Sequence, residues 1–541
     1  MLHCRQLALC VVVASALSLS AAPCAQAEEG SSLPDRWIFW LGNLAPAESV
    51  TKLEELIRRA AKAGYTGIAL NDSKMSHISV HGPEYLKNIE RIKAVAKECN
   101  FEIIPGIFSV GYSNDLLYLD PNMIEAMPAR DVPMEVKGGE AKLVAEDFPL
   151  GKPGYHDDNL TVEGLNWSGK AAGNNCRISF PIKLKPWREY HVSVKIKTKD
   201  FHGQAEIKVL TPNAGMDIQG NYLGAESTQD WKEHHVTFNS LNNTDVTLYF
   251  GTWGGKGELN WKDAKLEEVA FVNLVRRPGA PLVVTNEKGE TLTEGKDYEN
   301  LVDPLMGTKP WNGCYDQYHM PPVLKTKLPD GTKLKVSFHH VKLYFDNQAM
   351  LCPSEPKSYE MLKDNAMQVH KAFGAKRYFM SFDEIRVLNW CDACQKRHLD
   401  SGPLLADMAK KCVAIMKDVA PDAKLLTWND MFDPFHNAHK DYTLVRGDLT
   451  GSWEGLDKNV TIVHWLYDSR DKSIPFFTEK GYPLLIAGYY DEPGWEDHTK
   501  IWLESAKKAK AKLQGAMFTT WSSNYTDIEK FIKVVNAVYP K

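Results

Sequence analysis

Long apolar runs and long basic runs are both missing from this sequence after its first 27 residues. After residue 27 no stretch reaches the roughly 18 unbroken apolar residues that cross a bilayer, so we expect no membrane span. No long run of Lys or Arg occurs either, and 64 basic against 69 acidic residues leave a net charge of −5 over 541 residues. So small a charge, without a basic tract, argues against a nucleic-acid partner. Low-complexity tracts are absent too, and the length predicts two or three folded domains.

The first 27 residues have the features of an export signal. Arg5 gives a weakly positive start, residues 7–19 are mostly apolar, and residues 25–27 form a small-residue cleavage site. The apolar stretch is too short to span a bilayer. We therefore expect an exported protein, periplasmic or extracellular after cleavage. A lipid anchor at Cys24 is the alternative, although Pro23 makes it a poor lipidation site.

Cysteine is sparse, and a second Cys-x-x-Cys motif is missing. Removal of the signal leaves seven cysteines, namely Cys99, Cys176, Cys314, Cys352, Cys391, Cys394 and Cys412. The odd number implies at least one free thiol or an intermolecular bridge. Cys391 and Cys394 could form a metal clip or a short disulfide, but zinc takes about four ligands, so a structural or free pair is favoured. His339 and His340 also lack a third ligand at suitable spacing, and we expect no metal and no cofactor.

Strands and helices alternate in two separate parts of the chain. The first part has short apolar runs at 37–40, 66–70 and 101–107, with amphipathic helices expected at 48–63 and 83–99. In the second part we expect helices at 358–373, 404–419 and 501–513, and strands at 377–382, 424–428, 460–465, 483–487 and 515–521. The strands number eight only if both parts belong to one sheet. We therefore predict a single (β/α)8 barrel, or TIM barrel.

The residues between these two parts follow a different pattern. From about 140 to 268 apolar and polar residues alternate, with frequent turn residues, which predicts an antiparallel, jelly-roll-like β-sandwich inserted after the third barrel strand. The predicted segments are the signal at 1–27, the first part of the barrel at 28–139, the sandwich at 140–270, a β-rich connection at 271–345 and the rest of the barrel at 346–541. Two separate α/β halves that flank a sandwich are the alternative.

An apolar, aromatic run at 377–382 ends abruptly in two adjacent carboxylates, Asp383 and Glu384. The catalytic groups of (β/α)8 enzymes lie at the C-terminal ends of the strands, where these two acids are expected. Two acids side by side in a cleft cannot easily both ionise, so one tends to remain a proton donor. The pair could also simply cap the next helix, and Asp491-Glu492 repeats the dipeptide.

The later strands also end in residues that suit a sugar site. The aromatic ones are Trp428, Trp465, Tyr489, Tyr490 and Trp521, and the polar ones are Asp430, His464 and Asp491. Because indole rings pack well against apolar surfaces while keeping a polar edge, three Trp beside paired acids predict a sugar-sized pocket. His464 could instead be structural, and Asp430 could bind a hydroxyl or orient Asn429. The Trp residues of the sandwich are expected in its core or turns, with one or two as a possible sugar platform, namely Trp187, Trp231, Trp253 and Trp261.

One stretch around the acid pair resembles a known family. Residues 351–362 read Leu-Cys-Pro-Ser-Glu-Pro-Lys-Ser-Tyr-Glu-Met-Leu, and after a helix residues 378–384 read Tyr-Phe-Met-Ser-Phe-Asp-Glu. This is similar to the middle of the family 20 glycoside hydrolases, the β-N-acetylhexosaminidases. The order of later Trp, Tyr and acidic residues is similar as well, and the likeness covers roughly 35–115 and 345–541. The inserted sandwich looks like a carbohydrate-binding jelly roll.

The resemblance implies a retaining, substrate-assisted hydrolysis of glycans at N-acetylhexosamine residues. The sugar's 2-acetamido oxygen would attack the anomeric carbon, with Glu384 as general acid and then base, and Asp383 orienting the acetamido group. Tyr490, or Tyr489, would donate a hydrogen bond to the acetamido oxygen. The three Trp, with Asp430, His464 and Asp491, would complete the sugar site. A glycan is therefore the expected partner.

Three positions depart from the family pattern. The family usually has His-x-Gly-Gly before its acid pair, where this chain has Phe379 and Ser381-Phe382. Ser522-Ser523 stand where the family has a Glu after its last Trp, and the first strand supplies no Arg. These departures favour an altered sugar specificity. They also leave two alternatives: a glycosidase with a conventional nucleophile, Asp430 or Asp491 opposite Glu384, and a carbohydrate-binding barrel without catalysis.

Overall fold

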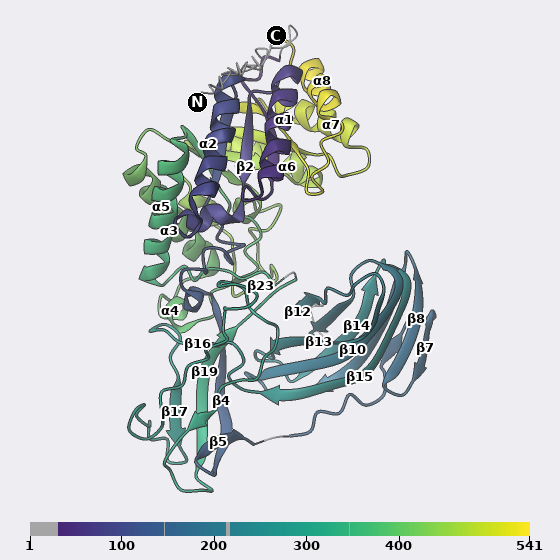
Figure 1. The fold of residues 1–541 in the computed structure, drawn as a ribbon, viewed down its shortest axis with the longest axis vertical. Helices are drawn as coiled ribbons and strands as arrows, with labels where there is room; N and C mark the ends of the chain where they lie inside the picture. The colour runs from purple at the N-terminus through teal and green to yellow at the C-terminus, as the bar shows by residue number, and fades with distance from the viewer. Residues whose placement is uncertain (1–30, 145, 212–216, 346) are drawn as a thin grey trace, which may run out of the picture.

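The computed structural model describes residues 31–144, 146–211, 217–345 and 347–541. The export signal expected at 1–27 therefore lies outside the described residues. Figure 1 shows a barrel with its helices in the upper part of the molecule and two β-rich bodies below it. No helix among the described residues is long and apolar enough to cross a membrane.

Eight parallel strands close into a barrel. In order around the barrel they are β1 (Asp35–Leu41), β2 (Gly67–Asn71), β3 (Glu102–Ile107), β20 (Arg377–Met380), β22 (Lys424–Trp428), β24 (Thr461–His464), β25 (Leu484–Tyr489) and β26 (Leu513–Thr519). Strand β26 pairs with β1, which closes the barrel, and β3 pairs with β20 through Phe379 and Gly106. The predicted eight-stranded barrel is thereby confirmed, and the alternative of two separate α/β halves is wrong.

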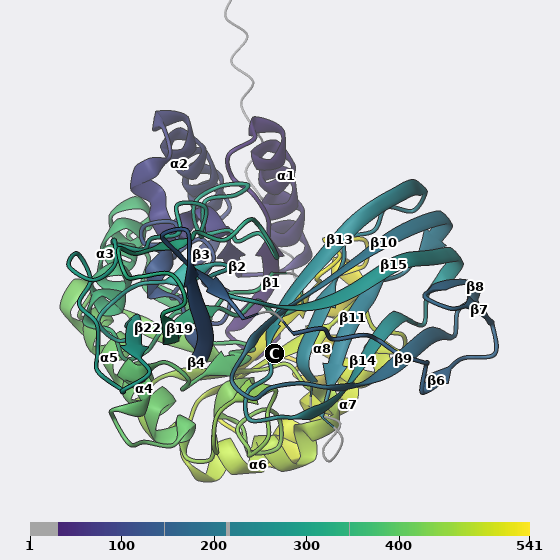
Figure 2. The ribbon, with the colours of Figure 1, turned by 90° about the horizontal axis from the view of Figure 1, so that it is seen from below.

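Helices surround the barrel. They are α1 (Ala47–Ala63), α2 (Pro83–Glu98), α3 (Pro356–Phe373), α5 (Ser401–Val419), α6 (Arg470–Glu479), α7 (Trp495–Lys508) and α8 (Ile528–Val538). In α1 an apolar stripe that includes Val50, Leu53 and Ile57 is buried, and Gly64 ends the helix in the left-handed conformation that glycine adopts without a steric cost. Figure 2 shows α1 and α2 side by side on one flank.

Two five-stranded sheets form the β-sandwich. One contains β13 (Gln229–Asn239), β10 (Glu189–His202), β15 (Lys256–Val269), β8 (Asn166–Ala172) and β7 (Leu160–Glu163). The other contains β12 (Asp217–Tyr222), β11 (Glu206–Leu210), β14 (Asp245–Trp253), β9 (Asn175–Lys183) and β6 (Tyr155–His156). Trp167 and Trp261 pack with Phe250 between the sheets, so Trp261 is a core residue as expected. Trp231 lies at the surface.

A third sheet lies beside the sandwich. Its order is β16 (Leu274–Val275), β19 (Lys333–Val341), β4 (Ala126–Lys137), β5 (Glu140–Leu143) and β18 (Leu324–Lys325), and β17 (Val283–Asn286) also pairs with β19. Strand β4 thus belongs to this antiparallel sheet and not to the barrel part expected to extend to residue 139. The period-two burial of Val132, Met134 and Val136 is the physical reason, because it gives β4 one buried face.

The strands β4 to β19 lie in sequence between β3 and β20, which are neighbours in the barrel. The loop that follows β3 and the loop that follows β20 therefore meet at the C-terminal end of the barrel. They approach so closely that a Cβ atom on Gly111 would lie 1.9 Å from the carbonyl oxygen of Asp383. Any side chain at position 111 would push the acid-bearing loop away.

Candidate active site

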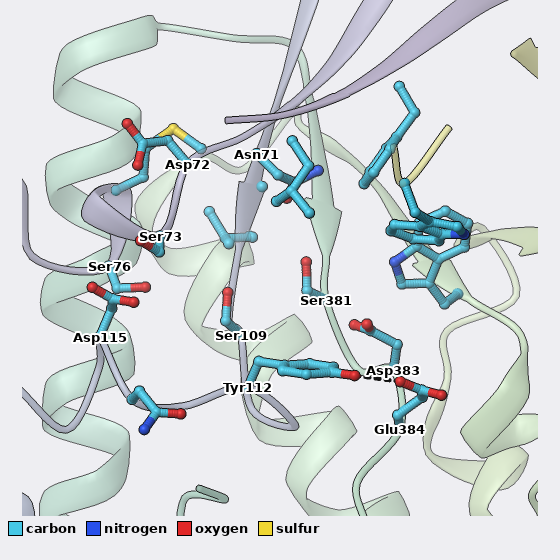
Figure 3. A pocket seen from close by; sticks show the side chains of 18 of the residues that line it. Asn71, Asp72, Ser73, Ser76, Ser109, Tyr112, Asp115, Ser381, Asp383 and Glu384 are labelled. Carbon is cyan, nitrogen blue, oxygen red and sulfur yellow. Dashed lines mark hydrogen bonds between the residues drawn. The ribbon is translucent and has the colours of Figure 1, made fainter. Parts of the chain in front are cut away.

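A cavity of about 580 Å³ opens at the C-terminal ends of the barrel strands. Five of the predicted site residues line it, namely Asp383, Glu384, Trp428, Trp465 and Trp521. In Figure 3 Asp383 and Glu384 lie at one end and Asn71, Asp72 and Asp115 at the other, with Ser109, Tyr112 and Ser381 between them. The volume lies within the range of small-ligand pockets.

Two side chains contact the Glu384 carboxylate, and its backbone adopts an unusual conformation. Its φ is 49°, in the left-handed region that a non-glycine residue rarely adopts. The Tyr112 hydroxyl donates a hydrogen bond to its Oε2, and Arg386 Nη2 lies 2.6 Å from its Oε1. Backbone strain of this kind persists only where the surroundings enforce it, and it gathers at functional sites.

Gln348 joins the loop of Glu384 to its neighbours. Its side-chain amide donates to the carbonyl oxygens of Gly111 (2.9 Å) and Glu384 (3.0 Å). Its oxygen accepts from Arg386 Nη1 at 2.6 Å. Gln348 therefore fixes both the backbone that carries the acid and the cation that pairs with it.

Asp383 and Asp430 are two carboxyl groups with raised pKa values. Burial, reinforced by the negative charges of Asp430 and Glu384, raises the pKa of Asp383 to about 8. Burial also raises the pKa of Asp430 to about 7. At neutral pH Asp383 is therefore mostly protonated and Asp430 about half protonated, whereas ordinary carboxyl groups are ionised.

Asp430 is fully buried and does not line the cavity. Its Oδ2 accepts hydrogen bonds from the Glu384 backbone N–H (2.8 Å) and from Asn437 Nδ2 (3.0 Å), and its Oδ1 accepts one from Trp465 Nε1 (3.4 Å). It therefore supports the acid pair and one Trp. The Asn429 side chain, which Asp430 could have oriented, donates a hydrogen bond to Asp433 instead (2.7 Å).

Aromatic rings form one wall of the cavity. Trp428 is almost fully buried, with its ring centroid 5.9 Å from that of Trp521 and 5.5 Å from that of Phe39. Trp521 is 43% exposed. Phe39, on β1, is a wall residue that sequence reasoning missed, although its place near the end of the first strand was available as a signal.

The polar end of the cavity was also missed. It comes from the end of β2 and from the loops after β2 and β3, and it includes Asn71, Ser73, Ser76 and Asp115. Burial raises the pKa of Asp115, and its neighbour Asp72 accepts hydrogen bonds from the backbone of Leu44 (2.7 Å) and from Tyr85 (3.0 Å). The rule that strands of a barrel end in functional residues, applied to β2, would have found Asn71 and Asp72.

Besides Asp430, four further predicted residues do not line this cavity. His464 is fully buried, its ring packs edge-on against Trp502, and burial lowers its pKa to about 3. Tyr490 donates a hydrogen bond to Asp527 at 3.3 Å, away from the cavity. Tyr489 is half-buried and does not line the cavity.

Asp491 is the fourth of these residues, and it holds a loop in place. Its carboxylate accepts hydrogen bonds from the backbone N–H of Trp521 (2.6 Å) and from the hydroxyls of Thr520 (2.9 Å) and Ser522 (2.5 Å). Asp491 therefore positions Trp521 through the backbone and does not itself reach the cavity.

Among the described residues, one group of His, Cys, Asp and Glu side chains lies close enough together to hold a metal ion. It consists of Glu125, Cys352, Cys391 and Cys394. None of the four lines the cavity.

Comparison with known proteins gives matches among solved structures alone. No family model and no curated protein matches the sequence. A β-N-acetylhexosaminidase structure is 9% identical, with 94% of this chain and 72% of that chain covered and a TM-score of 0.41. The chitobiase of Flavobacterium johnsoniae is 10% identical, with a TM-score of 0.37, and this chain, 94% covered, spans 51% of its length. A family 16 carbohydrate-binding module covers 22% of this chain and 89% of its own, at 15% identity and a TM-score of 0.16.

Proposed function

We propose that this protein is a glycoside hydrolase that acts at N-acetylhexosamine residues of glycans. The observation that carries the proposal is the pair Asp383 and Glu384, which lines a cavity whose wall contains Trp428, Trp465 and Trp521. Carboxyl groups supply the proton transfers of glycoside hydrolysis, and aromatic walls suit sugar rings. The resemblance of residues 351–362 and 378–384 to family 20 favours N-acetylhexosamine over other sugars.

The proposed reaction is retaining and substrate-assisted. The 2-acetamido oxygen attacks the anomeric carbon while the bond to the leaving oxygen breaks, which gives an oxazolinium intermediate. Glu384 donates a proton to the leaving oxygen and then removes one from the water that opens the intermediate. The Asp383 carboxylate accepts a hydrogen bond from the acetamido N–H. Because the substrate supplies the nucleophile, no second carboxylate is needed on the opposite face of the sugar.

The electrostatics favour a second assignment of the two acids. The pKa of Asp383 is raised to about 8, so this group holds a proton at neutral pH, whereas Glu384 forms an ion pair with Arg386. In this assignment Asp383 is the proton donor and Glu384 supplies the negative charge beside the acetamido group. The two assignments predict different responses to the leaving group, because a good leaving group needs no proton.

The test of the reaction uses aryl β-glycosides of N-acetylglucosamine and N-acetylgalactosamine, with and without a thiazoline that mimics the intermediate. We expect turnover that the thiazoline inhibits. Turnover of aryl glucosides that lack the acetamido group, unaffected by the thiazoline, would support a conventional nucleophile instead. Retained glycan binding without any turnover would support a carbohydrate-binding barrel.

The test of the residues compares Glu384→Gln and Asp383→Asn on substrates with a good and a poor leaving group. The variant that lacks the acid should lose most of its activity on the poor leaving group and keep more of it on the good one. Glu492→Gln is the matched control, since Glu492 ends the repeated Asp-Glu dipeptide and lies outside the cavity. Near-normal rates of Glu384→Gln on both substrates would remove Glu384 from either role.

The remaining sequence predictions complete the proposal. The β-sandwich predicted at 140–270 would bind carbohydrate, and the barrel parts at 28–139 and 346–541, joined through 271–345, would carry catalysis. The protein would be exported after removal of residues 1–27. N-terminal sequencing of the secreted chain should begin at Glu28, and a start at Met1 would contradict export by this signal.

A further inference from the structure

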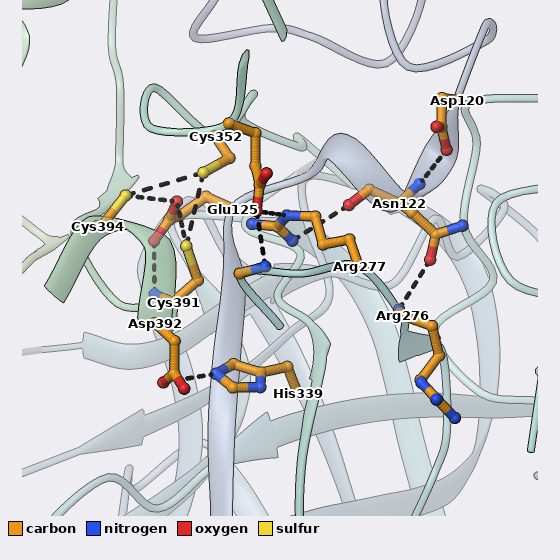
Figure 4. A network of polar contacts seen from close by, with 12 residues as sticks. Asp120, Asn122, Glu125, Arg276, Arg277, His339, Cys352, Cys391, Asp392 and Cys394 are labelled. Atoms are coloured by element: carbon orange, nitrogen blue, oxygen red, sulfur yellow. Dashed lines mark hydrogen bonds and ion pairs between the residues drawn. The ribbon is translucent and has the colours of Figure 1, made fainter. Parts of the chain in front are cut away.

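Four potential metal ligands that do not line the cavity converge on one another, as Figure 4 shows for their side chains. Glu125, Cys352, Cys391 and Cys394 are all buried, with exposed fractions of 1% or less. Cys352 Sγ lies 3.5 Å from Cys391 Sγ and 3.8 Å from Cys394 Sγ. Glu125 Oε2 lies 3.6 Å from Cys391 Sγ and 3.4 Å from Cys394 Sγ.

These separations match the edges of a tetrahedron around one ion. Zinc binds thiolate sulfur at about 2.3 Å and carboxylate oxygen at about 2.0–2.2 Å, which places tetrahedral S–S edges at about 3.8 Å and S–O edges at about 3.5 Å. All four ligand atoms lie within 4.8 Å of one another, which is too close for a multinuclear cluster between them. We propose that Glu125, Cys352, Cys391 and Cys394 bind one structural Zn²⁺ ion.

The surroundings hold the carboxylate ready for a single bond to the ion. Glu125 Oε1 accepts hydrogen bonds from the backbone N–H groups of Trp390 (2.6 Å) and Cys391 (2.9 Å). The other oxygen, Oε2, faces the sulfur atoms. Groups of this kind around a metal site fix the orientation of its ligands and strengthen binding. The backbone also brings two ligands together, because Glu125 N–H donates to Met350 O (2.7 Å) and Cys352 N–H to Met123 O (2.8 Å).

The charges near the cluster fit a thiolate-bound ion. Three thiolates, one carboxylate and Zn²⁺ carry a net charge of about −2. The buried guanidinium of Arg277 lies against the cluster, where its charge interacts with those of Cys352, Cys391 and Glu125. Glu355 Oε1 (3.0 Å) and Asn122 O (3.1 Å) hold Arg277 in this position.

A disulfide explains the cluster less well. It would need two Sγ atoms about 2.05 Å apart, and it would join only two of the four groups. The third thiol and the buried carboxylate would then take no part in the bond. A metal ion uses all four ligands, and the fold brings them together from positions 125, 352, 391 and 394.

The ion would fix the loop that carries the acid pair. Cys391 and Cys394 follow Glu384 by seven and ten residues, and Cys352 follows Gln348, which binds Glu384 and Arg386, by four. Glu125 stands where the chain leaves the barrel for β4. The ion would thus join three segments at the base of the active-site loop. This consequence for the loop rests on the proposed function, whereas metal binding does not.

Metal content is the first measurement. The full chain is purified with a tag that contains no histidine, in buffers without chelator, and analysed by inductively coupled plasma mass spectrometry. We expect about one zinc per chain, because structural sites of four protein ligands hold zinc tightly. Iron at the same ratio would refute the choice of ion. The absence of bound metal, together with a Cys391–Cys394 or Cys352–Cys391 disulfide in a non-reducing peptide map, would overturn the proposal.

Two ligand variants and one matched control make the assignment specific. Glu125→Gln keeps an oxygen for the two backbone N–H groups and removes only the anionic ligand, so zinc affinity should fall tenfold or more. Cys394→Ser should lower zinc content in the same way. Cys412→Ser changes a buried cysteine outside the cluster and should keep a full equivalent. Equal zinc content in all three variants would refute the site.

Cobalt reports the site without relying on the stability of any variant. The full chain is unfolded in chelator and refolded with Co²⁺. It should then show the intense visible absorption bands of tetrahedral cobalt and a thiolate charge-transfer band. The control variant Cys412→Ser should show the same bands. Weak octahedral bands would contradict a thiolate site. Zinc binding without glycosidase activity would leave the site supported and the proposed function refuted, so the two failures are distinguishable.

Discussion

Replacing Asp430 with Asn should destabilise the protein at acid pH and stabilise it at alkaline pH. Burial raises the pKa of Asp430 from 3.8 to about 7. A carboxyl group whose folded pKa lies above its unfolded value favours the folded state most below the unfolded pKa, and this contribution is lost as the pH rises through the folded pKa. For Asp430 the loss extends from about pH 4 to about pH 7.

The structure sets the size of both effects. Each pKa unit corresponds to about 1.4 kcal/mol, so the charged form of Asp430 costs at most about 4 kcal/mol of unfolding free energy. Asn is neutral and avoids this cost, but it offers one acceptor oxygen where Asp430 serves Glu384 N–H, Asn437 and Trp465. The lost hydrogen bond costs about 1 kcal/mol at every pH. The variant should therefore be about 1 kcal/mol less stable at about pH 4 and about 1–3 kcal/mol more stable at about pH 9.

Urea unfolding of Asp430→Asn and the parent, followed by Trp fluorescence at about pH 4 and about pH 9, measures this change of sign. Asp245→Asn is the control. Asp245 is exposed, and its hydrogen bond and charge pairing with Lys183 lower its pKa, so its removal should give no gain at alkaline pH. A loss of stability in Asp430→Asn that is equal at both pH values would refute the reasoning about a buried charge.

Two further substitutions test the cavity wall and the acid pair. Trp521→Ala should lower kcat/KM about tenfold with little change in the unfolding midpoint, since Trp521 is 43% exposed. Trp428→Ala should instead lower the unfolding free energy by about 3–5 kcal/mol, because Trp428 is buried against Phe39. Equal unfolding midpoints for the two Trp variants would contradict this division. Tyr112→Phe removes the hydroxyl that donates to Glu384 and should lower kcat roughly tenfold to hundredfold at constant KM; a change confined to KM would assign Tyr112 to binding alone.

The apolar runs made the barrel strands predictable. The strand expected at 424–428 matches β22, and the strand expected at 377–382 matches β20 except that β20 ends at Met380. Strands of a parallel barrel are buried on both faces and therefore appear in the sequence as nearly continuous apolar runs. The helix expected at 501–513 begins earlier, at Trp495, because its first turn contains the acidic Glu496 and Asp497, which favour a helix start.

Side-chain direction explains why two of the predicted site residues, His464 and Tyr490, do not line the cavity. Successive side chains of a strand point to opposite faces. Val463 and Trp465 pack in the barrel interior, so His464 between them points outward to Trp502 on α7. Ala487 also faces the interior, which places Tyr490 on the outer face. This alternation was available in the sequence and would have excluded both residues.

The cysteine cluster could not be predicted from spacing. Zinc motifs are recognised by pairs of nearby ligands, and only Cys391 and Cys394 are such a pair. Cys352 and Glu125 join them through backbone pairing between segments more than two hundred residues apart, such as Ile124 with Leu351. Contacts at this separation depend on the whole topology, which local sequence patterns do not contain.

The pairing of β3 with β20 has a consequence for how this chain folds. Gly106 and Phe379 are partners about 270 residues apart, so closing the barrel directly would require a very long loop. If the inserted sheets form first, the bridge between Ile124 and Leu351 already holds the two ends together, and the effective loop shrinks to about 45 residues. That shortening lowers the entropic cost of closure by about 1.5 kcal/mol. Inserted sheets that fold early would then favour closure of the barrel by acting as an internal template.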